Sequence, residues 1–184
     1  LYLRQAARST VARRGSTLRT FFTWAQEEEL VHANPTRGMR TPKRENHLPP
    51  VLSREQMNQL LTTLQERRAQ DPRDARLLRL EAVVEVLYAS GMRISELTGL
   101  DLQSVDRANK TVRVLGKGNK ERVVPLGTPA LKALNRWVSY GRPQWIPEGS
   151  QGVTALFIGP RGGRANARQI REDLTRLLRT VENT

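Results

Sequence analysis

Residues 88–97 decide the fold of this chain, because they form a corner between two helical patterns. They read Tyr-Ala-Ser-Gly-Met-Arg-Ile-Ser-Glu-Leu. The apolar period before them predicts a helix from about Asp74, and Gly91 is typical of the position just after a helix end. Arg93 begins the next short helix, where unpaired N–H groups and the positive end of the helix dipole favour an anion. The alternative is an ordinary corner in which Glu96 pairs with Arg93.

Beyond this corner the apolar period changes from 3.6 to 2, which predicts a β-hairpin. Residues 111–115 and 121–125 flank the turn at residues 116–120, Gly-Lys-Gly-Asn-Lys. The two glycines allow the backbone to approach another molecule closely, and Lys117 between them can enter a groove and give up a proton. A solvated surface hairpin is the alternative. A nucleotide-binding phosphate loop is a poor match, because this turn joins two strands and the Gly-x-x-x-x-Gly-Lys-Ser/Thr pattern is absent.

The remaining apolar patterns are helical, apart from one short predicted strand at residues 155–158. A first helix is expected from an N-cap at Ser9 to about Leu30, with apolar residues at helical spacing as its buried stripe. Ser53 with Gln56 three residues later predicts a capping box that opens the next helix. Further helices are predicted at residues 129–140 and 167–181.

Residues 38–50 divide the chain, because they contain three prolines and few apolar residues. Such a composition is typical of an extended linker, here a basic one. The sequence thus predicts an α+β fold with a partial, all-helical arm at residues 1–37. Residues 51–184 form a mixed domain in which helices pack a small antiparallel sheet.

The composition indicates a polyanionic partner. The 184 residues carry 31 Lys plus Arg against 18 Asp plus Glu, a formal net charge of +13, and such a surplus attracts nucleic acid. The cations gather in three stretches, residues 4–44, 107–122 and 161–179, so we expect a protein that wraps double-stranded DNA. With no Cys and two His, a disulfide scaffold, a thiol nucleophile and a His-rich metal site are excluded. Without a membrane-spanning run or a secretory signal, we expect a cytoplasmic protein with no membrane or small-molecule partner.

Two motifs and their spacing resemble the tyrosine recombinases of the Xer group, within the phage integrase family. They are residues 88–97 and residues 116–127, Gly-Lys-Gly-Asn-Lys-Glu-Arg-Val-Val-Pro-Leu-Gly, with Lys117 24 positions after Arg93. The resemblance runs over about residues 12–181. It implies that a SAM-like helical core-binding domain and a catalytic domain close around DNA. It also implies that a tyrosine hydroxyl attacks a phosphodiester, giving a 3′-phosphotyrosyl link and a free 5′-hydroxyl.

The resemblance also assigns roles to individual residues. Arg93 would stabilise charge on the non-bridging phosphate oxygens, Lys117 would protonate the departing 5′-oxygen, and Glu96 would support Arg93. Neither a metal nor a cofactor is implied. The family works as a tetramer, often with a paralogous recombinase, in chromosome dimer resolution or in the integration of mobile elements. Further cations would contact DNA, namely Arg13, Arg14, Arg19, Lys43, Arg44, Lys120, Arg122 and Arg168.

The second half of the family's catalytic set is missing from the chain. A His-x-x-Arg box, a further His or Trp and the nucleophilic tyrosine should follow the last helix, whereas His32 and His47 precede the corner. Tyr88 is the tempting substitute, but it lies on an apolar helix pattern and is expected in the core. The helical arm is incomplete as well. We therefore expect an internal or truncated portion of a recombinase, which binds duplex DNA without cleaving it.

Two other functions stay open on the sequence alone. One is a non-catalytic DNA-binding module, in which the arm and the linker grip phosphates. The other is a metal-dependent nuclease with Glu96, Asp101 and Asp106 as carboxylate ligands. These acids show no recognised ligand spacing, and surface acids are the default interpretation.

Overall fold

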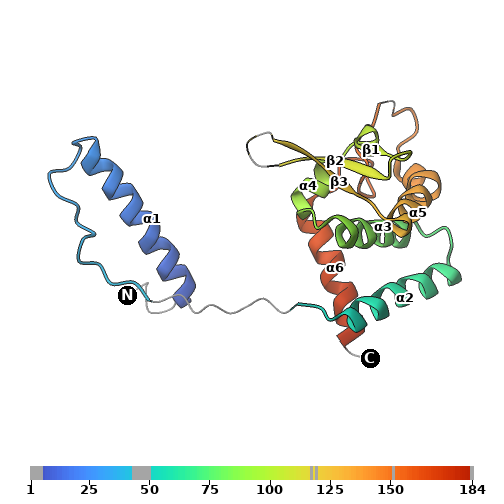
Figure 1. The fold of residues 1–184 in the computed structure, drawn as a ribbon, viewed down its shortest axis with the longest axis horizontal. Coiled ribbons are helices and arrows are strands. Elements are labelled where there is room, and N and C mark those ends of the chain that lie inside the picture. Colours follow the sequence, from blue (N-terminus) through green and yellow to red (C-terminus); the bar gives the residue numbers. More distant parts are fainter. Residues whose placement is uncertain (1–5, 43–50, 117, 119, 151, 183–184) are drawn as a thin grey trace. The chain divides into compact units, whose positions relative to one another are not determined.

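The computed structural model describes residues 6–42, 51–116, 118, 120–150 and 152–182 (Figure 1). The chain divides into two compact units, Leu1–Val51 and Leu52–Thr184. The first unit contains one long helix, and the second packs helices against a three-stranded antiparallel sheet. The predicted α+β class is confirmed.

The helix of the first unit, α1 (Arg8–Glu27), begins and ends earlier than its sequence pattern predicts. Its N-cap is Ala7, so the prediction of Ser9 as the N-cap is wrong. Beyond the helix the chain turns at Glu29, whose φ of 58° lies in the left-handed region. The helix therefore stops before Leu30.

One face of α1 is apolar and nevertheless exposed. Leu18 and Phe21, which the helical spacing predicts in the buried stripe, are exposed, and so is Trp24, whereas Ala25 of the same stripe is buried. The rings of Phe21 and Phe22 pack edge to face, with centroids 5.2 Å apart. The prediction of burial is wrong for Leu18 and Phe21, because the described part of this unit offers α1 only one short segment to pack against.

That segment crosses α1 at a position where only glycine fits. A Cβ placed on Gly15 would lie 2.2 Å from Cγ2 of Thr41, far inside ordinary contact distance. Arg19 ties the same segment to the helix, because its Nη2 donates to the carbonyl oxygen of Met39 at 2.6 Å and to Oγ1 of Thr41 at 3.2 Å. Packing at this crossing holds the first unit together.

Two helices of the second unit begin at side-chain caps. In α2 (Arg54–Gln70), Ser53 and Gln56 form the predicted capping box, each side chain accepting the other's backbone N–H. In α3 (Ala75–Ser90), the carboxylate of Asp74 accepts two backbone N–H groups of the first turn. Both helix starts follow from local side-chain chemistry.

The corner after α3 leads to the sheet. Gly91 ends α3 with a φ of 60°, which favours glycine, and α4 (Ile94–Gly99) follows at once. The sheet then runs in the order β1 (Val105–Asp106), β2 (Thr111–Leu115) and β3 (Glu121–Pro125), all antiparallel. The predicted hairpin is confirmed as β2 and β3 (Figure 1).

The two strands of the hairpin are anchored differently. Val112 and Val114 of β2 are fully buried in the core, whereas β3 is an edge strand whose side chains are mostly exposed. Arg122 of β3 lies opposite Val114 in the register. Backbone hydrogen bonds to β2 therefore provide most of the contacts that hold β3 in place.

The remaining named elements of the unit are helices and helical turns. Trp137 is fully buried, and its Nε1 donates to the carbonyl oxygen of Leu156 at 2.9 Å. The last helix contacts α2, α3 and α4 (Figure 1). The elements beside the sheet are a short 3₁₀ turn η2 (Leu102–Ser104), α5 (Thr128–Arg136), a π-helical turn η4 (Trp137–Gly141), a 3₁₀ turn η5 (Arg142–Trp145) and α6 (Ala167–Glu182).

The predicted strand at residues 155–158 is wrong. The segment makes two isolated bridges, one between Ala155 and Asp101 and one between Ile158 and Arg164. Because its two ends pair with different segments, no continuous ladder forms. The apolar run is nevertheless buried, as its composition predicts.

Two neighbouring carboxylates of α3 are buried. Glu81 accepts from Nη2 of Arg136 at 2.6 Å and from Nε of Arg68 at 3.3 Å. Glu85 lies one turn further along the helix and is buried as well. Burial, and then the charge of Glu81, raise the pKa of Glu85, while Arg136 acts in the opposite direction.

Replacing Gly15 tests the crossing in the first unit. We expect Gly15→Ala to speed amide hydrogen exchange across α1 several-fold, because the new methyl group displaces Thr41. The free-energy cost of this displacement should exceed the gain of about 1 kcal/mol from the better helix propensity of alanine. Ser16→Ala is the matched control, because Ser16 is exposed on the same helix. Equal exchange rates in the two variants would contradict the close crossing.

Glu85→Gln tests the buried carboxylate. A raised folded-state pKa means that Glu85 destabilises the fold once it ionises, so the variant should melt at a higher temperature than the wild type at pH 7. The difference should vanish below the ordinary glutamate pKa of about 4.3. The control is Glu66→Gln on the exposed face of α2. An unchanged or lower Tm of the variant at pH 7 would show that ionised Glu85 does not destabilise the fold.

Candidate functional site

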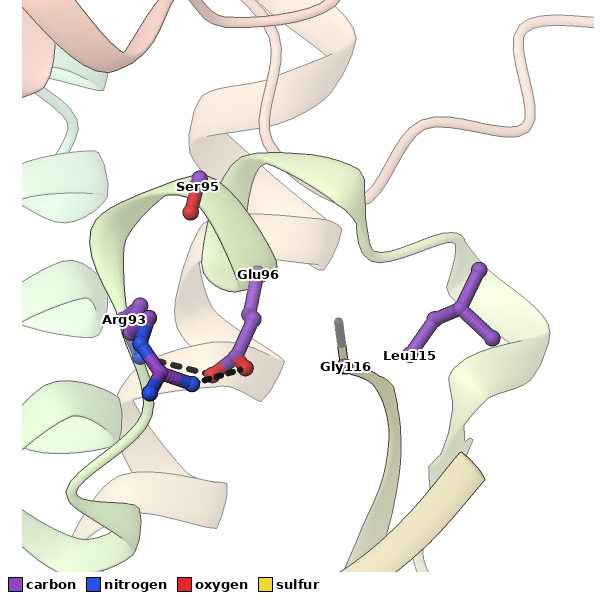
Figure 2. A pocket seen from close by; sticks show the side chains of 5 residues that line it. All are labelled: Arg93, Ser95, Glu96, Leu115 and Gly116. Atoms are coloured by element: carbon purple, nitrogen blue, oxygen red, sulfur yellow. Dashed lines mark hydrogen bonds and ion pairs between the residues drawn. The ribbon is translucent and has the colours of Figure 1, made fainter. Parts of the chain in front are cut away.

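The corner and the hairpin meet at one open pocket. Its volume is about 390 Å³, and the corner forms one side of it while the end of β2 forms the other (Figure 2). The pocket is lined by Arg93, Ser95, Glu96, Leu115 and Gly116. Both motifs that the sequence singled out therefore contribute to the same site.

Glu96 sits between two arginines from different elements. Its Oε2 accepts the backbone N–H of Arg93 at 2.8 Å, and its Oε1 accepts from Nη1 of Arg93 at 3.0 Å (Figure 2). Arg122 of β3 donates Nη1 to Oε1 at 3.0 Å and Nη2 to Oε2 at 2.8 Å. The pairing of Arg93 with Glu96, one of the two alternatives at the corner, is therefore present.

The carboxylate is shielded while the guanidinium of Arg93 is not. The Glu96 side chain is 6% exposed, against 74% for Arg93 and 41% for Arg122. The hydrogen bonds from Arg122, followed by the backbone N–H of Arg93, lower the pKa of Glu96 to about 2, although burial acts against them. Glu96 also raises the pKa of Arg122. Two guanidinium groups and one carboxylate leave one net positive charge at the pocket.

Gly116 brings the hairpin backbone close to this ion pair. A Cβ at Gly116 would lie 3.3 Å from Nη1 of Arg122 and 3.9 Å from Oε1 of Glu96. The N–H of Gly116 donates to the carbonyl oxygen of Lys120 at 2.8 Å and closes the base of the turn. Lys117, the residue after Gly116, lies outside the described residues.

The expected DNA contacts of the first unit differ in their surroundings. Arg13 and Arg14 are exposed on α1, with no ion pair to any residue that the structure describes. Arg19 is half-buried and bonded to the segment that crosses α1. Lys43 and Arg44 lie outside the described residues. Of the DNA contacts expected in this unit, Arg13 and Arg14 are thus the two described residues that are free to meet an anion.

In the second unit, the cations expected to contact DNA lie on separate elements. Lys120 is exposed at the end of the turn, whereas Arg122 faces Glu96. Arg168 is the second residue of α6, its side chain is 85% exposed, and its Nε donates to Oε1 of Glu172 at 2.9 Å. Ser95 lines the pocket two residues after Arg93 in the same motif, although it was not predicted as a site residue.

A second basic surface lies along α6, within the cation-rich stretch at residues 161–179 that the sequence singles out, although only Arg168 was named there as a DNA contact. It forms an open groove of about 460 Å³. Helical spacing was the available signal, because residues three and four positions apart share a face. The groove is lined by Arg168, Arg171, Glu172, Thr175, Arg176 and Arg179.

The three carboxylates of the nuclease alternative do not converge. Glu96 binds the two arginines, Asp101 accepts from Nη2 of Arg164 at 2.6 Å, and Asp106 accepts from the backbone N–H of Asn109 at 2.9 Å. Among the described residues no group of three or more acidic, His or Cys side chains could hold a metal ion. The geometry gives this alternative no support.

Tyr88 does not lie in the core, and that prediction is wrong. Its side chain is 56% exposed, because it lies at the edge of α3 beside an apolar groove of about 380 Å³ between α2, α3 and α6. This groove does not include Arg93.

None of the helices within the described ranges is long and apolar enough to cross a membrane.

Comparison with known proteins agrees with the motifs. Residues 50–184 match the phage integrase family. The chain is 43% identical over 161 residues to the tyrosine recombinase XerC of Actinobacillus pleuropneumoniae serotype 7 (strain AP76), covering 88% of this chain and 49% of that protein. It is 41% identical over 165 residues to the tyrosine recombinase XerC of Mycobacterium sp. (strain KMS), covering 90% and 54%. The chain thus spans about half the length of these curated relatives.

The fold is also that of solved recombinase structures. The Tn1549 transposon integrase in complex with circular intermediate DNA superposes with a TM-score of 0.70 at 18% identity, covering 99% of this chain and 61% of that one. The predicted resemblance to the Xer group, and to XerC in particular, is confirmed by the identities above. The sequence match, the fold and the shared motifs agree, and the chain belongs to the phage integrase family of tyrosine recombinases.

Proposed function

We propose that this chain is the DNA-binding portion of a XerC-type site-specific recombinase, and that its pocket receives the phosphate to be cleaved. The observation that carries the proposal is the exposed guanidinium of Arg93, held against Glu96 beside the end of the hairpin. Of its guanidinium nitrogens, only Nη1 has an acceptor among the described residues. The remaining donors point away from Glu96 and are available to non-bridging phosphate oxygens.

The proposed chemistry uses Arg93 and Lys117 in complementary ways. A tyrosine hydroxyl gives its proton to a general base as its oxygen forms a bond to phosphorus. The bond between phosphorus and the 5′-oxygen breaks, and Lys117 donates a proton to that oxygen to give a 5′-hydroxyl. Arg93 stabilises the charge that grows on the phosphate during attack. Glu96 acts through Arg93, because an ionised carboxylate fixes the direction of the guanidinium.

The chain alone binds DNA without cutting it in this proposal. Neither His32 nor His47 begins a His-x-x-Arg sequence. Among the described residues the pocket lining contains no tyrosine, and Tyr88 borders the separate apolar groove. In this proposal the chain supplies the half of the site that stabilises charge, and no described residue of the pocket lining is a tyrosine that could attack the phosphate.

The partner in this proposal is double-stranded DNA, gripped by cations of both units. Arg13, Arg14, Lys120 and Arg168 are exposed and suited to phosphate contact, and Lys43 and Arg44 of the linker complete the grip. The recombinase acts in the cytoplasm as a tetramer with an identical or paralogous subunit. Its proposed role is chromosome dimer resolution, with mobile-element integration as the competing one.

A nicked suicide duplex tests binding and cleavage together. We expect the chain to shift a duplex in a gel at low salt and to release it as salt rises, because phosphate contacts displace condensed counterions. No covalent protein–DNA band should form on a denaturing gel. A covalent band would contradict the missing nucleophile, and failure to bind duplex at low salt would contradict the function itself.

Arg93→Gln tests the phosphate contact. The variant should bind duplex more weakly, and the slope of log K against log salt should fall by about 1, the value for one lost phosphate contact. Lys132→Gln is the matched control, because it removes one exposed cation from α5, outside the pocket lining. Equal slopes in the two variants would show that Arg93 acts only through net charge.

A further inference from the structure

Arg122 is the side chain that joins the hairpin to the corner. It reaches from β3 to Glu96 of α4 and donates to both carboxylate oxygens, at 3.0 and 2.8 Å. Two parallel hydrogen bonds between a guanidinium and a carboxylate fix orientation as well as distance. The proposed function assigns no such role to a residue of β3.

We propose that Arg122 is a positioning residue for the phosphate site, and that it holds the hairpin end at Gly116 and the Arg93 corner in register through Glu96. This inference rests on the proposed function, because the register matters only if the pocket receives a phosphate. It replaces the role of direct phosphate contact that the sequence predicts for Arg122. Both terminal nitrogens of Arg122 already have acceptors inside the protein.

The packing of the hairpin shows why such a residue is needed. β3 is an edge strand with mostly exposed side chains, so the apolar core fixes it weakly. Besides the backbone ladder with β2, Arg122 supplies a side-chain attachment at the end of the strand nearest the turn. Gly116 lies against it, since a Cβ there would come within 3.3 Å of Nη1 of Arg122. Movement of this ion pair therefore moves the wall of the pocket.

Glu96 transmits the same constraint to the corner. Its Oε1 is shared by Nη1 of Arg93 and Nη1 of Arg122, and its Oε2 by the backbone N–H of Arg93 and Nη2 of Arg122. Without Arg122 the Glu96 carboxylate keeps only the hydrogen bonds from Arg93 among those described. The guanidinium of Arg93 then loses the fixed direction in which it meets a phosphate.

Arg122→Lys separates positioning from charge. Lysine keeps the cation but cannot grip both carboxylate oxygens with a planar fork, so positioning predicts that Arg122→Lys and Arg122→Gln weaken duplex binding alike. A direct phosphate contact predicts that lysine restores binding. The matched control is Arg113→Lys with Arg113→Gln, because Arg113 is an exposed cation of β2 in the same sheet. Its Nε lies 4.0 Å from Oε2 of Glu121.

Amide hydrogen exchange of the free protein gives the second readout. The N–H of Gly116, which closes the base of the turn, should exchange about tenfold faster in both Arg122 variants, because the hairpin end opens more often. It should be unchanged in the Arg113 variants. Unchanged exchange at Gly116 in Arg122→Gln, or wild-type binding and exchange in Arg122→Lys, would overturn the proposal.

The two readouts also separate this inference from the proposed function. If the wild-type chain fails to bind duplex, the proposed function fails, while exchange at Gly116 still decides whether Arg122 holds the hairpin. If duplex binding is present and Gly116 exchange does not respond to Arg122, the function stands and the inference falls.

Discussion

The candidate site depends on one buried carboxylate between two guanidinium groups. Glu96 gives Arg93 an internal partner on one edge and leaves its other donors facing solvent. A fully paired arginine would be neutralised, and an unpaired one would be free to swing. The second guanidinium, from Arg122, keeps the pocket positive despite the carboxylate and attaches the hairpin to the corner. A six-residue helix, a turn and an edge strand thereby act as one site.

Local signals predicted most of the secondary structure. The capping box at Ser53, the C-terminal glycine of α3 and the hairpin all depend on residues close in sequence, and the structure confirms each of them. The errors arise where distant packing decides. Residues 155–158 are apolar enough for a strand, but their ends pair with different segments. Leu18 has the spacing of a buried residue without anything described to cover it.

The sequence predicted which charged residues form the candidate site, but it predicted less well which of them bond to one another. The motif placed Arg93 and Glu96 one helical turn apart, so their pairing could be expected. The partner of Arg122 could not, because Glu96 lies 26 positions away and every arginine carries the same donors. The bond of Arg19 to Met39 is a similar case. With 31 Lys and Arg in the chain, only the folded arrangement separates cations that hold the protein from cations that can meet DNA.

The most direct measurement is an NMR titration of the Glu96 side-chain carboxyl carbon in the wild-type chain. Held between Arg93 and Arg122, this carboxyl should titrate with a pKa of about 2. It would then remain ionised at every pH at which DNA binds. A midpoint near the ordinary glutamate value of about 4.3 would show that the two arginines do not share Glu96, and the account of the site would be contradicted.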